Sequence, residues 1–212
     1  MNPGIAFLIA YSAGSIPFAY LAGRVVKGID LRTVGSGNLG ATNVYRALGA
    51  KAAIVVFAAD LLKGALPTAL LPRYVLPADA LGTDRAVWWA LAFGVAAIVG
   101  HAKPVFLLWR GGGKGVATAA GIFAALAPVP VVLALAVFVV VLWRTGYVSA
   151  SSLTAATALP LLLAGFTGVT SPLTIVATLV CVFVYWSHRE NIERLRNGTE
   201  HRFGRTSSGE GA

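Results

Sequence analysis

Four polar segments rich in glycine, serine, asparagine and basic residues interrupt this otherwise apolar chain of 212 residues. They read GSGNLGATNVYR (35–46), GHAKPVFLLWRGGGKG (100–115), RTGYVSASS (144–152) and HRENIERLRNGTE (188–200). Glycines let backbone N–H groups approach a ligand closely, and Lys and Arg side chains donate well to phosphate. These residue types therefore indicate binding of phosphorylated molecules.

The first segment places three glycines before a predicted helix. Gly35, Gly37 and Gly40 precede a helical pattern that resumes near Ala41 and ends at Gly49. A helix amino terminus is a favourable seat for phosphate, and an arginine at position 46 adds a fork of donors. The alternative is an interfacial turn whose serine and asparagine side chains satisfy the turn's own backbone.

The second segment carries a glycine run before Lys114 and continues as GVATAAG, which also predicts an anion seat at a helix start. It is not a nucleotide P-loop, because Gly115 follows the lysine in place of Ser or Thr and a spanning helix precedes it in place of a strand. The alternative is a surface lysine that meets lipid phosphate.

Isolated titratable residues are further candidates for functional roles, and each of them has two interpretations. His188 and Asn191 share a face if the last helix continues, so His188 is either a base or an interfacial structural residue. His101 is either functional or packed at the inner end of its helix. Asp60 and Lys63 lie inside a helix three residues apart, which permits either a functional role or a mutual ion pair.

Serines open a later predicted helix, and metal chemistry is not indicated. Ser149, Ser151 and Ser152 stand where hydroxyls cap a helix or donate to a ligand. A single cysteine, Cys181, and three histidines without ligand spacing lead us to expect no metal and no cofactor. Aromatic–basic repeats that stack bases are absent, so we expect no nucleic-acid partner.

Long apolar runs must position these polar segments. The chain is 57% hydrophobic and 12% charged, against about 45–50% and about 25% in soluble domains, and a spanning helix needs roughly 20 apolar residues. This excludes a soluble enzyme folded around one core. The fourth predicted helix is too short to span upright and is rich in Gly and Ala, so we expect it to pack inside the bundle. The predicted helices cover residues 4–24, 50–72, 86–108, 115–127, 129–144, 149–168 and 171–187.

Basic residues predict the orientation. They concentrate in the first, third and fifth connections and in the tail, whereas the opposite side has only Arg73 and Arg85. Short loops rich in Lys and Arg stay in the cytosol. We therefore predict an all-α polytopic membrane protein with about seven transmembrane helices, the N-terminus outside and the C-terminus cytosolic. Residues 1–204 are expected to form a single integral-membrane domain and residues 205–212 a disordered tail.

The motifs GSGNLGATNVYR, GH..PVF with GGKGVATA, and HRENIERLxxGTE together resemble those of the bacterial PlsY-type glycerol-3-phosphate acyltransferases. The likeness runs from the first helix to about Phe203. It implies a membrane enzyme of seven helices with a cytosolic active site, located in the inner (plasma) membrane of a bacterium. It also implies acyl transfer from acyl phosphate to the sn-1 hydroxyl of glycerol 3-phosphate, giving lysophosphatidic acid and phosphate in the first acylation of phospholipid synthesis.

Residue roles follow from the same resemblance. The implied catalytic residues are Ser36, Lys114, His188 and Asn191. The implied substrate-binding residues are Gly37, Asn38, Thr42, Asn43, Arg46, His101, Gly112, Gly113, Ser149 and Ser152. The family's basic-Gly-Gly-Lys-Gly pattern is one glycine longer here, from Arg110 to Lys114.

The expected partners are glycerol 3-phosphate, acyl phosphate and the lipid bilayer. Acyltransferases that use acyl-CoA or acyl-carrier protein at this step usually carry His-x4-Asp, which this chain lacks. Either His188 or an oxygen of the donor phosphate accepts the proton of the attacking hydroxyl. The main rival function is transport of an organic phosphate, although transporters usually bind near the midplane rather than at one membrane edge. A non-catalytic membrane scaffold is a second rival.

Overall fold

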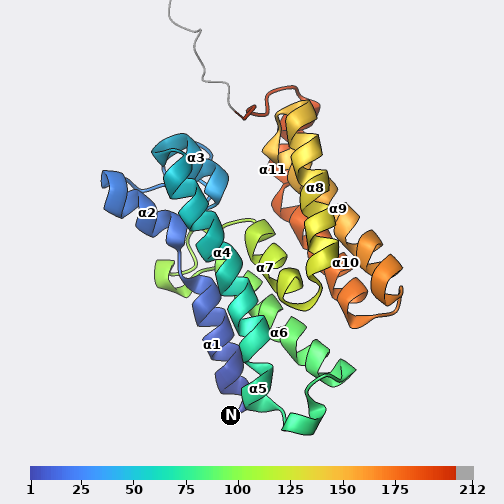
Figure 1. Ribbon diagram of the computed structural model, residues 1–212. Coiled ribbons are helices and arrows are strands. Elements are labelled where there is room, and N and C mark those ends of the chain that lie inside the picture. The colour runs from blue at the N-terminus through green and yellow to red at the C-terminus, as the bar shows by residue number, and fades with distance from the viewer. Residues whose placement is uncertain (204–212) are drawn as a thin grey trace, which may run out of the picture. The chain divides into compact units, whose positions relative to one another are not determined.

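The computed structural model describes residues 1–203, which are helical apart from turns and loops (Figure 1). The chain divides into two compact units, Met1–Val129 and Pro130–Ala212, and each is described by itself. The tail expected over residues 205–212 lies outside the described residues.

The first unit contains seven α-helices and two short 3₁₀ helices within the described residues, and the start of an eighth helix. These are α1 (Pro3–Ser15), α2 (Phe18–Lys27), α3 (Ala41–Leu48), α4 (Ala50–Leu70), α5 (Pro72–Val75), η1 (Ala78–Ala80), α6 (Asp84–Ala102), η2 (Val105–Leu107) and α7 (Val116–Leu126), followed by the first residues of α8.

Two predicted helix boundaries were wrong, and proline explains both. The helix expected over 4–24 is broken between α1 and α2, because Pro17 has no N–H to donate and disfavours helical backbone in Ile16 before it. The helix expected over 86–108 ends at Ala102, since Lys103 precedes Pro104 and takes an extended φ of −133°. Residues 103–108 instead form a turn and the short helix η2.

Small residues allow the helices of this unit to approach closely. A Cβ added to Gly14 of α1 would lie 2.1 Å from the carbonyl oxygen of Ala97 in α6. A Cβ added to Gly121 of α7 would lie 1.9 Å from the carbonyl oxygen of Leu61 in α4. Such close contact replaces hydrophobic burial as the driving force between membrane helices. The expected internal packing of the glycine-rich fourth helix, α7, is confirmed by these contacts and by its buried Ile122 and Phe123.

Within the described residues, the second unit consists of three long helices and a short terminal helix. It holds most of α8 (Pro128–Thr145), together with α9 (Val148–Thr167), α10 (Pro172–Ser187) and α11 (Arg189–Arg196). Helix α9 packs against both α10 and α11. The last helix does not continue straight through the fourth polar segment, because the axis bends by 59° between α10 and α11, where His188 lies.

Length and hydropathy identify the membrane-spanning candidates. Among residues 1–203, five helical runs qualify, and the bent α10–α11 pair makes six if it is counted as one span. The five runs are Pro3–Lys27 (α1 and α2 together), Ala50–Val75 (α4 and α5), Asp84–Leu107 (α6 and η2), α8 and α9. The remaining predicted segment, α7, has 11 residues and is shorter than a span. All seven predicted segments are therefore helical, and the protein is an all-α membrane protein with five or six candidate spans.

Candidate active site

The side chain of Asn43 organises the first polar segment through hydrogen bonds to the backbone. Its amide nitrogen donates to the carbonyl oxygens of Leu31 (3.1 Å) and Val34 (3.0 Å), and its Oδ1 accepts from the Ser36 backbone N–H (3.2 Å). Asn43 is buried in the first turn of α3. The side chain therefore ties the helix to the loop before it, which we call the first loop (residues 31–40).

Gly35 is required by this arrangement. Its φ is +61°, and a Cβ there would lie 2.4 Å from the Asn43 Oδ1 atom. Any larger residue would be strained in backbone and would displace the amide that organises the loop.

Buried leucines hold both ends of the first loop in the protein core. Leu31 and Leu39 pack in one cluster with Val44 of α3 and with residues of α2 and α4. Ser36 lies between these anchors and is exposed, and α3 begins soon after at Ala41. This bears out the expected order of glycines followed by a helix amino terminus. Four further predicted site residues lie on this stretch, namely Gly37, Asn38, Thr42 and Arg46.

The second polar segment joins the first through backbone hydrogen bonds. We call residues 103–115 the second loop. The Leu39 N–H donates to the Gly112 carbonyl oxygen (3.1 Å), and the Gly113 N–H donates to the His101 carbonyl oxygen (3.1 Å). Lys114 follows directly and precedes α7. Two segments more than 60 positions apart in the sequence thus form one polar surface in the first unit.

Arg32 is a second link between the two loops, and the sequence analysis did not single it out. Its Nη1 donates to the Arg110 carbonyl oxygen (3.3 Å), and its Nη2 pairs with Asp30 Oδ2 at 2.7 Å. The hydrogen bonds from the Arg32 side chain, helped by its backbone N–H and by the positive charges of Arg32 and Arg24, lower the pKa of Asp30 to about 2. Asp30 is therefore ionised at neutral pH and holds the guanidinium in place.

His101 points away from the loop surface and into the protein. It is buried, and its Nδ1 lies 3.7 Å from Asp60 Oδ1. The predicted ion pair between Asp60 and Lys63 is confirmed, with 2.7 Å between Lys63 Nζ and the same oxygen. His101 was assigned to substrate binding by resemblance, and in the structure it lines a cavity of about 10 Å³.

In the second unit, Glu200 forms hydrogen bonds with two predicted site residues, Ser149 and Asn191. Glu200 Oε1 accepts from the Ser149 hydroxyl (3.0 Å) and from the Asn191 amide (2.8 Å), and Oε2 accepts from Arg194 Nε (2.7 Å). Burial favours the neutral form, but these hydrogen bonds and the Arg194 charge outweigh it and lower the pKa of Glu200. Glu200 stands within the fourth polar segment, yet no spacing rule pointed to it.

Of the two interpretations of the serines that open α9, helix capping was wrong. Tyr147 occupies the capping position, and no side chain there caps the helix. The Ser149 hydroxyl is instead used by Glu200, while the Ser151 hydroxyl donates to the Tyr147 carbonyl oxygen (2.8 Å). Ser152 is buried in the same turn.

The hydrogen bond of His188 determines which of its ring nitrogens can act as a base. Nδ1 lies 2.8 Å from the Val184 carbonyl oxygen, which can only accept, so Nδ1 carries the hydrogen. In the neutral ring, Nε2 then carries the lone pair. His188 is 4% exposed and stands at the junction of α10 and α11.

The predicted site residues thus assemble in two groups, one in each unit. The first unit joins the segment with Ser36, Asn43 and Arg46 to the segment with Gly112, Gly113 and Lys114. The second unit brings together Ser149 and Asn191 through Glu200, with His188 at the adjacent helix junction. The fold and these loops define a helical membrane protein whose polar segments combine backbone amides, cations and a histidine.

Comparison with known proteins identifies the family. The model of the family described as glycerol-3-phosphate acyltransferase matches residues 4–198. A glycerol-3-phosphate acyltransferase of Geobacter metallireducens is 49% identical over 195 residues, covering 92% of this chain and 94% of the relative. One of Prochlorococcus marinus is 44% identical over 207 residues, covering 96% and 99%.

Similarity to solved structures supports the same family assignment. The crystal structure of PlsY (YgiH), an integral membrane glycerol 3-phosphate acyltransferase, in its glycerol 3-phosphate form has a TM-score of 0.86 at 38% identity and covers 96% of both chains. Its lysophosphatidic acid form has a TM-score of 0.83 at 36% identity, again with 96% coverage of both chains. The chain belongs to the glycerol-3-phosphate acyltransferase family, and it is an integral-membrane acyltransferase of phospholipid biosynthesis.

Proposed function

We propose that this enzyme transfers a fatty acyl group from acyl phosphate to the sn-1 hydroxyl of glycerol 3-phosphate, giving lysophosphatidic acid and phosphate. The observation that carries the proposal is the hydrogen bond between Leu39 and Gly112, which unites two glycine loops and their cationic residues into one surface. Backbone amides, Arg46 and Lys114 are the donors that phosphate groups require. The absence of a His-x4-Asp motif supports acyl phosphate over thioester donors.

The reaction needs positioning more than covalent catalysis, because acyl phosphate is already activated. The glycerol hydroxyl oxygen attacks the acyl carbon, the bond from that carbon to the phosphate oxygen breaks, and phosphate leaves. His188 Nε2 or an oxygen of the donor phosphate takes the hydroxyl proton. Lys114 and backbone amides stabilise the departing phosphate and the carbonyl oxyanion. Positioning alone is worth up to roughly 7–11 kcal/mol.

The fatty chain requires an apolar surface, and the first unit offers one. Helices α2 and α4 form an apolar groove of about 520 Å³, lined by aliphatic residues such as Val25 and Val55, with Lys51 also among the lining residues. Val56 lines this groove and also packs in the cluster that holds Leu31 and Leu39 of the first loop. A hydrocarbon chain in the groove would therefore lie against the scaffold of the phosphate-binding loop.

We further propose seven transmembrane segments, with the short helix α7 counted as one of them, in the inner membrane of a bacterium, with the N-terminus outside and the active site in the cytosol. The asymmetric distribution of Lys and Arg between the two sides supports this orientation.

A direct assay tests the reaction. Purified enzyme is given labelled glycerol 3-phosphate with palmitoyl phosphate or with palmitoyl-CoA, and lipid product and released phosphate are measured. We expect one phosphate per lysophosphatidic acid from palmitoyl phosphate and no product from the thioester. Ser36→Ala, Arg46→Ala and Lys114→Ala should each lower kcat/KM at least about tenfold, because each removes a donor to phosphate. Arg85→Ala removes an exposed cation outside both loops and serves as the control. Full activity in the three site variants would refute the site assignment.

The choice of base has its own test. His188→Asn retains an amide donor for the Val184 carbonyl oxygen but supplies no base, so it separates anchoring from proton transfer. If His188 is the base, kcat falls about 10²–10⁴-fold, the usual contribution of a positioned base. A loss smaller than tenfold in the folded variant would assign the proton to the donor phosphate.

A further inference from the structure

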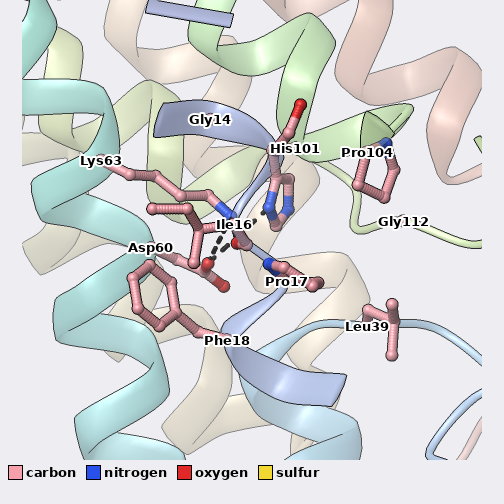
Figure 2. Close-up of a pocket in the computed structure, with 11 residues that line it drawn as sticks. Gly14, Ile16, Pro17, Phe18, Leu39, Asp60, Lys63, His101, Pro104 and Gly112 are labelled. Carbon is pink, nitrogen blue, oxygen red and sulfur yellow. Dashed lines mark hydrogen bonds and ion pairs between the residues drawn. The ribbon is translucent and has the colours of Figure 1, made fainter. Parts of the chain in front are cut away.

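Three buried polar side chains lie directly beneath the two loops. Asp60 and Lys63 come from α4 and His101 comes from α6, and they are 2%, 5% and 7% exposed. Figure 2 shows the three side chains pointing toward one another. We call them the buried triad. The proposed reaction does not use them directly, although burying such groups within a membrane protein is costly and is usually tied to function.

The triad connects three separate parts of the first unit. Lys63 Nζ lies 2.7 Å from Asp60 Oδ1 and also donates to the Ile16 carbonyl oxygen (3.1 Å). Ile16 stands at the break between α1 and α2, where Pro17 has removed a helical hydrogen bond partner. Lys63 therefore holds the break in α1–α2 against α4, and the carboxylate of Asp60 holds Lys63.

His101 links the triad to the second loop. A Cβ added to Gly113 would lie 2.0 Å from His101 Nε2, so the imidazole packs directly under that glycine. The Gly113 N–H also donates to the His101 carbonyl oxygen. The opposite nitrogen, Nδ1, faces Asp60. The imidazole thus separates the Asp60 carboxylate from the backbone that leads into Lys114.

The cavity at the triad is too small for a substrate. It measures about 10 Å³, roughly the space of one water molecule, and its lining includes Leu39 and Gly112, the residues whose hydrogen bond joins the two loops. Glycerol 3-phosphate cannot enter such a space. A side chain that moves there must push on the loops, because a close-packed interior leaves little room for adjustment.

Stability alone does not account for the triad. A well-packed apolar replacement of a buried ion pair is often neutral or stabilising, whereas removal of one partner is strongly destabilising. The cost of burying Asp60 and Lys63 is therefore better explained by the geometry that they impose on the parts they connect.

We propose that Asp60, Lys63 and His101 act as positioning residues that hold the Gly112–Gly113 backbone, and with it Lys114 and the first loop, in the geometry that binds glycerol 3-phosphate. The ligand named here rests on the proposed function. The three side chains act through the loops and do not touch the substrate.

Binding of glycerol 3-phosphate to the purified full-length protein, measured by calorimetry without any acyl donor, tests the proposal. His101→Leu places an apolar side chain beside Asp60, and we expect its Kd to rise at least about tenfold, since a shift of 1 Å costs as much as 10²-fold. His101→Asn keeps an amide near Asp60 and should recover most of the affinity. In turnover, KM for glycerol 3-phosphate should rise more than kcat falls. Thr68→Val, a buried change elsewhere on α4, should match the wild type.

A double variant distinguishes weaker binding of glycerol 3-phosphate from loss of the folded state. Asp60→Asn with Lys63→Met removes both charges together, so no unpaired charge stays buried. We expect this variant to unfold at or above the wild-type temperature and still to bind glycerol 3-phosphate at least about tenfold more weakly. Wild-type affinity in the folded double variant, or equal defects in His101→Leu and His101→Asn, would overturn the positioning role.

The same measurements separate this inference from the proposed reaction. If the wild type binds glycerol 3-phosphate but makes no lipid from acyl phosphate, the donor assignment fails while the triad's role is still decided by binding. If the wild type binds no glycerol 3-phosphate, the proposed substrate site itself is wrong.

Discussion

At the scale of single residues, two side chains organise the two groups of candidate site residues. Asn43 makes three hydrogen bonds to the backbone of the first loop. Glu200 accepts three hydrogen bonds, one from Ser149 of α9 and two from Asn191 and Arg194 of α11. Asn43 was expected to bind substrate and Glu200 had no assigned role. Both act in this structure by holding other site residues in place.

Glu200 makes stability depend on pH in a defined direction. Its folded-state pKa lies below its usual value of 4.5, so it stabilises the folded enzyme above pH 4.5 and this contribution is lost as pH falls through the lowered pKa. Glu200→Gln should therefore lower the thermal unfolding midpoint at pH 7 by a few degrees, equivalent to about 1 kcal/mol. Thermal scans of both proteins between pH 7 and pH 3 measure this difference.

The control for this prediction is Glu190→Gln, because Glu190 is exposed and pairs only loosely with Arg189, at 3.8 Å. Its midpoint should follow the wild type at every pH. A Glu200→Gln defect that stays constant down to pH 3 would show that the ionised carboxylate is not what stabilises this unit.

At the scale of elements, the second loop depends on glycines that admit close contact. Gly112 would bring a Cβ within 2.1 Å of the Ala102 carbonyl oxygen, and Gly113 would bring one within 2.0 Å of His101 Nε2. These glycines lie between the end of α6 and Lys114, so the path of the loop is set by how closely it follows α6.

Gly113→Ala should weaken binding of glycerol 3-phosphate. The added methyl group must displace either the loop or the imidazole of His101, and we expect kcat/KM to fall at least about tenfold because the donors at Lys114 move. Steady-state kinetics with glycerol 3-phosphate measure the effect. The matched control is Gly165→Ala in α9, where a Cβ meets nothing within 4 Å. Unchanged kinetics in Gly113→Ala would contradict the close packing of this loop on His101.

At the scale of the whole molecule, the distribution of basic residues bears on which side of the membrane the polar segments face. All four connect to helix ends that carry most of the Lys and Arg residues, while the segment between α4 and α6 carries few. Membrane insertion retains positively charged short loops in the cytosol. The proposed cytosolic active site depends on this charge asymmetry.

Reporter fusions test the orientation. A reporter active only in the cytosol should be active when it is fused after Ala212 and inactive when fused after Gly82, between α4 and α6, because these positions lie on opposite sides in the proposed topology. A reporter active only outside the cytosol should give the reverse pattern and serves as the control. Activity of the second reporter after Ala212 would refute the proposed orientation.

The sequence by itself determined the helices, the polar segments between them and the family. Apolar runs long enough to span a membrane are local properties of the chain, as is the motif around Ser36, and Asp60 and Lys63 are one helical turn apart. The helix boundaries at Pro17 and Pro104 were misplaced although the sequence contains both prolines. Hydropathy alone did not reveal these boundaries, because a proline next to an apolar run ends a helix without changing the hydropathy.

Only the tertiary structure decided how these local pieces meet. Hydrogen bonds join Leu39 to Gly112, Asn191 to Glu200 and Lys63 to Ile16. No helical periodicity relates the residues of these pairs, so the sequence pattern did not predict the contacts. The direction of the His101 side chain was likewise open, because a histidine at a helix end fits either a ligand or a buried partner. Packing of α4 against α6 placed it beside Asp60, and a buried carboxylate is stabilised by such polar neighbours.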